Sequence, residues 1–235
     1  LIQRQLAEAI FQTGKKVITV VNQGRPYVIT EIAEKTNGLI GSFYGGMKAG
    51  QGIAEVLFGE ISPSGHLPVS IPRSSGQIPA YYNYKSSYQG MHYYDVKEGA
   101  LYPFGYGLSY SKFTYSVNRD SSQREYYPID MEDFRANGLK IHLSVKNTGN
   151  YNAHTVLFLY IRDVEASTIR RVRELKDFQK LWIPKGGIVS GKLMLDEEKL
   201  SLWNSEMEFV MEPGEFELLL NDGVNDVWKG TVLIS

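Results

Sequence analysis

The spacing of apolar residues changes partway along the 235-residue chain, and this change constrains the fold more than any single motif. Residues 17–21 and 38–43 are short continuous apolar runs, each followed by a turn and a helical pattern. Such runs are typical of strands buried on both faces of a parallel sheet. From residue 139 onward, apolar and polar residues alternate, which is typical of half-buried strands. The sequence therefore predicts an α/β + all-β chain, in which a partial parallel α/β sandwich layer precedes an antiparallel β-sandwich.

Helical patterns flank the two apolar runs of the first part and cover residues 1–10, 27–35 and 50–58. The first of these patterns starts without a capping residue, and the chain starts without Met. We therefore expect the chain to be a fragment of a longer protein.

The second part contains about seven short segments with strand character within about 120 residues, which is the spacing of a β-sandwich. These segments are residues 113–117, 139–145, 155–162, 174–183, 188–195, 215–220 and 227–234. We expect no helix between residues 139 and 234. The polar stretch 118–135 reads as a linker with some order at its end.

The region between the two parts, residues 62–110, has no clear period and is rich in Gly, Pro, Ser and Tyr. Long irregular loops of this kind are more often functional than not. The region ends in LYPFGYGLSY at residues 101–110, where Pro103, Gly105 and Gly107 exclude a helix interior. Its four aromatic rings need cover, so we expect an ordered, aromatic-rich turn.

Charge and composition exclude several classes of partner and site. The net charge of −1 gives no electrostatic reason to expect nucleic acid or an anionic membrane as a partner. The absence of cysteine excludes disulfides, thiolate metal sites and a cysteine nucleophile, and it is compatible with the cytoplasm without excluding secretion. The 16 tyrosines offer flat faces that suit carbohydrate, although large β-sheet cores also use them.

Glycine pairs and histidines give no sign of a cofactor. The pairs at Gly50 and Gly52 and at Gly105 and Gly107 do not complete a nucleotide-binding motif. The four histidines are scattered without the spacing of metal ligands. We therefore expect neither a cofactor nor a metal ion.

Several stretches, in order along the chain, resemble the signatures of family 3 glycoside hydrolases. The sequence EVLFGEISPSGHLP at residues 55–68 is similar to that family's VLFG…PSGKLP signature, and residues 101–110 are close to its LYPFGYGLSY junction. Further similar stretches are QGRP at 23–26, IPAYYN at 78–83, VKNTG at 145–149, RELKDF at 173–178, LSLW at 200–203 and EPGEF at 212–216. The resemblance covers nearly the whole chain.

The resemblance implies a division at residue 112. Residues 1–112 correspond to the C-terminal portion of the family's α/β sandwich domain, and residues 113–235 to its fibronectin type III-like, immunoglobulin-like β-sandwich. It also implies a retaining glycosidase that acts on β-linked glucosides or short β-glucan oligosaccharides. The parent enzyme would also contain an N-terminal barrel domain, and a homodimer is one assembly that the resemblance allows.

None of the residues in the chain matches a family catalytic position. In the family, the Asp nucleophile lies on the N-terminal barrel and the acid/base Glu lies upstream of the helix with which this chain starts. Asp95 and Glu98 are the least implausible substitutes, but nothing in the sequence supplies them with a partner. We expect the isolated chain to be inactive.

Substrate contacts are expected from the loops that follow the carboxyl ends of the α/β strands. We expect some of these side chains to line the aglycone side of the active site, where tyrosine faces suit sugar rings; the candidates are Lys48, Tyr81, Tyr82, Asn83, Lys85 and His92. Lys48 stands where the family often has Glu, Tyr84 where it has His, and His92 where it often has Arg.

Three alternatives stay open. The chain could belong to a β-xylosidase of the same family, to a non-catalytic carbohydrate-binding module, or to a domain that only stabilises its parent. The tyrosines of residues 81–84 could also simply pack on the β-sandwich.

Overall fold

The computed structural model describes residues 2–85, 94–118 and 126–235, which form two compact units. The first unit comprises residues 1–60, 69–80 and 89–103, and the second comprises residues 61–68, 81–88 and 104–235. The loop region found in the sequence therefore contributes segments to both units.

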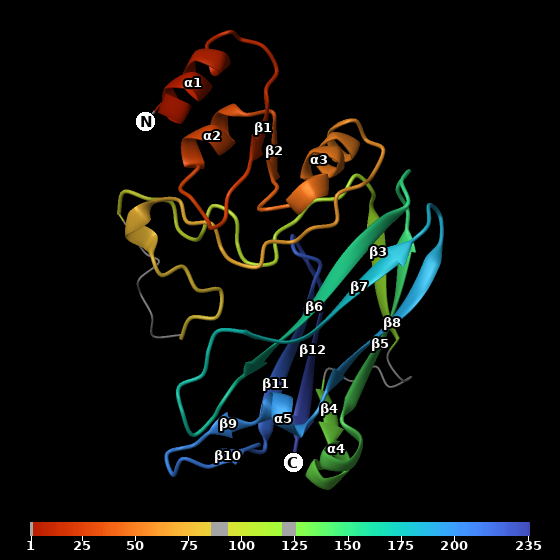
Figure 1. Cartoon of the computed structure of the whole chain (residues 1–235). Coiled ribbons are helices and arrows are strands. Elements are labelled where there is room, and N and C mark those ends of the chain that lie inside the picture. The colour runs from red at the N-terminus through yellow and green to blue at the C-terminus, as the bar shows by residue number, and fades with distance from the viewer. Residues whose placement is uncertain (1, 86–93, 119–125) are drawn as a thin grey trace. The chain divides into compact units, whose positions relative to one another are not determined.

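The first unit is a small parallel α/β layer. Its elements are α1 (Ile2–Phe11), β1 (Ile18–Val21), α2 (Thr30–Lys35), β2 (Gly38–Gly41), η1 (Gly46–Lys48), α3 (Ala49–Leu57) and η2 (Ser75–Gln77). Strands β1 and β2 pair in parallel, with Ile18 opposite Gly38 and Val21 opposite Gly41 (Figure 1). The predicted parallel α/β arrangement is confirmed.

The predicted burial of the first strand on both faces is wrong for this chain. The exposed fractions of Ile18 and Val20 are 55% and 36%, and no described residue of α1 or α3 is buried. A two-stranded sheet with three short helices has too little surface to cover both faces of its strands.

The second unit is the predicted β-sandwich. One sheet has five strands in the order β4-β12-β11-β6-β7, and the other has three in the order β3-β5-β8 (Figure 1). The strands are β3 (Phe113–Asn118), β4 (Tyr126–Ile129), β5 (Leu139–Asn147), β6 (Ala153–Asp163), β7 (Glu174–Ile183), β8 (Ile188–Leu195), β11 (Gly214–Asn221) and β12 (Asp226–Ile234). All seven strands expected from the sequence are present. The neighbours pair antiparallel, except that β4 pairs in parallel with β12.

Short elements add detail to the expectations. The order expected at the end of the stretch 118–135 is present, because residues 126–135 contain β4 and the start of α4 (Met131–Asn137), which is capped by the Asp130 side chain. The expectation of no helix after residue 139 is wrong by one turn, since Asp196 caps α5 (Glu197–Leu200). A short hairpin, whose strands β9 (Leu202–Trp203) and β10 (Phe209–Val210) have two residues each, was also not expected.

Among the described residues, no helix has the length and apolar character needed to cross a membrane.

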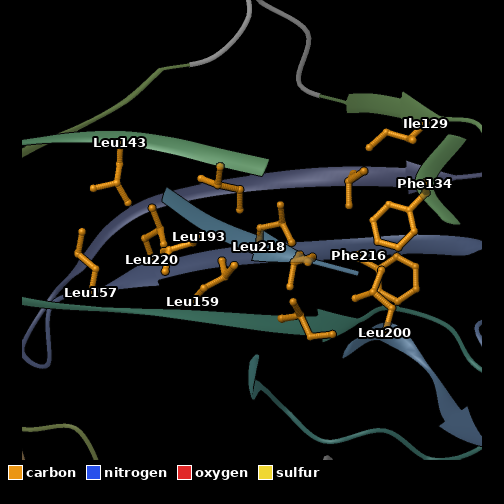
Figure 2. Packing of buried hydrophobic residues seen from close by; sticks show 14 of the residues in the cluster. Ile129, Phe134, Leu143, Leu157, Leu159, Leu193, Leu200, Phe216, Leu218 and Leu220 are labelled. Carbon is orange, nitrogen blue, oxygen red and sulfur yellow. The ribbon is translucent and has the colours of Figure 1, made fainter. Parts of the chain in front are cut away.

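The core of the second unit lies between its two sheets. Alternate residues of each strand point inward, and Val145, Leu159 and Ile183 are fully inaccessible. Figure 2 shows Phe134 of α4 and Phe216 of β11 at the same end of this core. Helix α4 therefore covers one end of the sandwich with an aromatic side chain.

Candidate functional site

Loop segments of the second unit cover part of the outer face of its five-stranded sheet. Strand β6 places Phe158 and Tyr160 on that face, and Tyr82 and Phe104 pack on them. The Tyr82 and Phe104 rings stack with centroids 4.4 Å apart, and the Tyr82 ring meets that of Tyr160 edge-on at 5.9 Å. Because this cover lies over the outer face and the core over the inner face, β6 is buried on both sides.

The FGYG turn at residues 104–107 is anchored on the same unit. The Gly105 amide donates to the Leu67 carbonyl at 2.8 Å, and the Leu67 amide donates to the Tyr106 carbonyl at 2.9 Å. His66 Nδ1 lies 2.7 Å from the Gly105 carbonyl oxygen. A carbonyl can only accept, so Nδ1 is the protonated ring nitrogen. Burial lowers the pKa of His66, which favours the neutral ring in this contact.

The structure places the predicted substrate-binding residues in two groups. Tyr81, Tyr82, Asn83 and Lys85 lie on one short segment of the second unit. Lys48 ends η1 in the first unit, where its Nζ donates to Gln51 Oε1 at 3.2 Å. His92 lies outside the described residues.

The two neighbouring tyrosines differ in accessibility. Tyr81 has an exposed fraction of 57%, so its ring face is accessible to a ligand in this chain. Tyr82 is partly buried by Phe104 and Tyr160, and its hydroxyl accepts a 3.4 Å hydrogen bond from the Leu175 amide. Packing on the sandwich therefore accounts for Tyr82, whereas Tyr81 stays available for binding.

Sequence reasoning missed the β6–β7 loop, residues 164–173, as a partner of this segment. Arg171 Nη1 donates to the Asn83 carbonyl oxygen at 2.7 Å. The Val172 amide donates to the Tyr84 carbonyl at 2.9 Å, and Lys85 and Arg171 form an isolated antiparallel bridge. The sequence carries no signal for this pairing, because 88 residues separate Arg171 from Asn83 and a single bridge has no repeating pattern.

The two carboxylates singled out in the sequence as substitutes for a catalytic pair lie in the first unit. Asp95 and Glu98 are exposed in irregular backbone of the first unit. Within residues 2–85, 94–118 and 126–235, no group of three or more His, Asp or Glu side chains could hold a metal ion.

A mixed-charge groove of 630 Å³ lies on the outer face of the five-stranded sheet. In this groove, Arg162 Nη1 lies 3.2 Å from Glu217 Oε2. Val172 and Arg173 of the β6–β7 loop form part of the groove wall. The sequence does not single out this groove, because its lining comes from three strands and a loop.

An ionic network fixes the start and end of the β6–β7 loop. Arg170 Nε lies 3.4 Å from Oδ2 of Asp163, and its Nη2 lies 3.1 Å from Glu174 Oε1. Lys176 pairs with the same Glu174 at 2.8 Å. Burial raises the pKa of Asp163 to about 6, with Glu212 and Glu174 adding to this rise and Arg170 and Lys176 opposing it.

This raised pKa predicts a pH-dependent contribution of Asp163 to stability. The folded chain holds the Asp163 proton more tightly than the unfolded chain does, so the contribution is present below about pH 4 and is lost as the pH rises through about 6. We expect the stability of the unsubstituted chain relative to Asp163→Asn to fall by about 2 kcal/mol between pH 4 and 7. Urea unfolding of both proteins across this range measures it. A difference that stays constant with pH would contradict the prediction.

The fold defines a class of protein in which a small parallel α/β layer is joined to a fibronectin type III-like sandwich. The model of the glycosyl hydrolase family 3 C-terminal domain matches residues 2–110, and that of the fibronectin type III-like domain matches residues 155–223. The chain belongs to family 3 of the glycoside hydrolases and corresponds to the C-terminal part of these enzymes.

Curated relatives include the periplasmic β-glucosidase of Salmonella typhimurium, 36% identical over 228 residues, which are 93% of this chain and 29% of that enzyme. A putative β-xylosidase of Formosa agariphila is 36% identical over 227 residues, covering 97% of this chain and 29% of the relative. A solved β-glucosidase from Listeria innocua in complex with glucose is 32% identical, with a TM-score of 0.88 over 99% of this chain and 33% of that one. The chain thus spans about 30% of the length of these relatives.

Proposed function

We propose that this chain forms the C-terminal part of a retaining β-glucosidase that hydrolyses β-linked glucosides or short β-glucan oligosaccharides. The observation that carries this proposal is the likeness to a solved β-glucosidase along 99% of the chain at 32% identity. The relatives also include β-xylosidases, so the glycone is the finer point that an experiment must decide.

In this proposal the chain contributes to substrate binding, while both catalytic carboxylates belong to other parts of the enzyme. Retaining hydrolysis needs two carboxyl groups about 5 Å apart, one ionised to attack the anomeric carbon and one protonated to release the leaving group. Tyr81 would offer its exposed ring face to the aglycone sugar, and Lys48, Asn83, Lys85 and His92 would offer polar groups to its hydroxyls. Tyr82 would hold residues 81–85 on the sandwich through its packing on Phe104.

We expect the isolated chain to leave p-nitrophenyl β-glucoside unhydrolysed, because it lacks the pair of carboxylates that this chemistry requires. The full-length enzyme should hydrolyse this substrate and should prefer it to the β-xyloside by kcat/KM. Release of p-nitrophenol by both proteins measures the two expectations. Turnover by the purified chain that disappears in Asp95→Asn would contradict the assignment of the catalytic pair, and a preference for the xyloside would favour the β-xylosidase.

Binding and assembly separate the remaining alternatives. A non-catalytic carbohydrate-binding module would bind β-glucan tightly as the isolated chain, which titration calorimetry with laminari- and cello-oligosaccharides measures. A homodimer remains a prediction, and light scattering of the full-length enzyme tests it.

A further inference from the structure

The fibronectin type III-like sandwich contacts the segment that carries four of the proposed substrate-binding residues. Residues 81–85 belong to the second unit, and three of them form hydrogen bonds with one loop of the sandwich and the strand that follows it. Arg171 donates to the Asn83 carbonyl, Val172 to the Tyr84 carbonyl, and Leu175 to the Tyr82 hydroxyl. Three successive residues of the segment are therefore bound to a five-residue stretch of the sandwich.

The loop that makes these contacts is itself held on both sides. Arg170, next to Arg171, lies between Asp163 at the end of β6 and Glu174 at the start of β7. Earlier in the loop, the amide and hydroxyl of Ser167 both donate to the carboxylate of Glu212. Arg171 is thus presented by a backbone with few alternative positions, which lowers the entropy cost of its bond to Asn83.

Arg171 has the chemistry of a positioning residue. Its guanidinium donates to the backbone carbonyl of Asn83. The contact therefore holds the backbone of residues 81–85 in place and does not depend on the Asn83 side chain. A charged donor to a carbonyl is stronger than a neutral one, and the planar donor group holds a direction as well as a distance. Displacement of this carbonyl would move the neighbouring Tyr81 ring and Lys85 together.

We propose that Arg171 positions residues 81–85, so that the sandwich domain, acting through its β6–β7 loop, determines the geometry of the aglycone side of the active site. The link to catalysis rests on the proposed function, whereas the positioning itself does not. In this proposal the sandwich domain shapes the substrate site in addition to stabilising the enzyme.

Hydrogen–deuterium exchange on this chain tests the positioning directly. In Arg171→Ala, we expect the amides of residues 81–85 and of Val172 to exchange at least several-fold faster, while the strands of the core keep their protection. Arg171→Lys should restore part of the protection, because its ammonium group can still donate to the Asn83 carbonyl. The matched control is Arg162→Ala, an exposed arginine on the same sheet that pairs with Glu217 instead. Unchanged exchange in Arg171→Ala, or an equal change in Arg162→Ala, would overturn the proposal.

Kinetics of the full-length enzyme distinguish a failure of positioning from a failure of the proposed function. With faster exchange established, Arg171→Ala should raise KM for cellobiose several-fold and leave kcat nearly unchanged, with recovery in Arg171→Lys. Faster exchange with an unchanged KM would support positioning by Arg171 and would contradict a role of residues 81–85 in substrate binding. A raised KM without faster exchange would overturn the positioning and leave the proposed function intact.

Discussion

Replacing Gly223 by Ala should destabilise the second unit by about 3–4 kcal/mol, because two independent costs fall on the same residue. Gly223 has φ of +93°, a conformation that side chains with Cβ disfavour. A Cβ atom there would lie well inside the contact distance of the Gly105 carbonyl oxygen and 2.5 Å from His66 Nδ1. Backbone and a partly buried ring cannot move aside cheaply, so the clash would push the FGYG turn off the sandwich.

The matched control for this prediction is Gly186→Ala. Gly186 has φ of +72° but nothing within 4 Å of its added Cβ, so it carries the conformational cost alone, about 1 kcal/mol. Urea unfolding of the two variants and the unsubstituted chain measures both values. Equal losses of unfolding free energy would show that only the positive φ of Gly223 matters and that the FGYG turn does not pack tightly against Gly223.

Asn147→Ala should cost about 3 kcal/mol of unfolding free energy, since it leaves several buried polar groups without partners. Asn147 is fully inaccessible at the end of β5. Its Nδ2 donates to the carbonyls of Tyr151 at 2.7 Å and Ile183 at 3.0 Å, and its Oδ1 accepts from Ser111 Oγ at 2.6 Å and from the Gly149 amide at 3.0 Å. The side chain therefore joins the segment just before β3, the β5–β6 turn and the end of β7.

Asn137→Ala is the control for Asn147→Ala, because Asn137 is exposed and its side-chain amide donates to the Asp133 carboxylate on the same helix. We expect its effect to stay within about 0.5 kcal/mol. Thermal and urea unfolding of both variants provide the comparison. A loss of less than about 1 kcal/mol for Asn147→Ala would mean that water or neighbouring groups take over its four hydrogen bonds.

The local sequence determined seven strands of the sandwich and the family. Alternation in residues 139–145 is a property of neighbouring side chains, so the burial of Ile141, Leu143 and Val145 could be predicted without knowing their partners. The ordered motifs, among them residues 55–68 and 101–110, identified family 3 for the same reason, since each motif is a continuous stretch.

Tertiary structure alone decided the features that depend on distant partners. Strand β4 exists because it pairs with β12, more than 100 residues later, and the polar residues on either side of its four-residue sequence YYPI conceal it in the sequence. Tyr81 and Tyr82 are adjacent and chemically identical, yet only Tyr82 meets Phe104 and Tyr160. The pKa of Asp163 and the bond between Arg171 and Asn83 likewise arise from burial and from contacts across the fold. Local patterns encode the periodicity of a strand, but which buried groups meet is set only when the sheets and loops pack together.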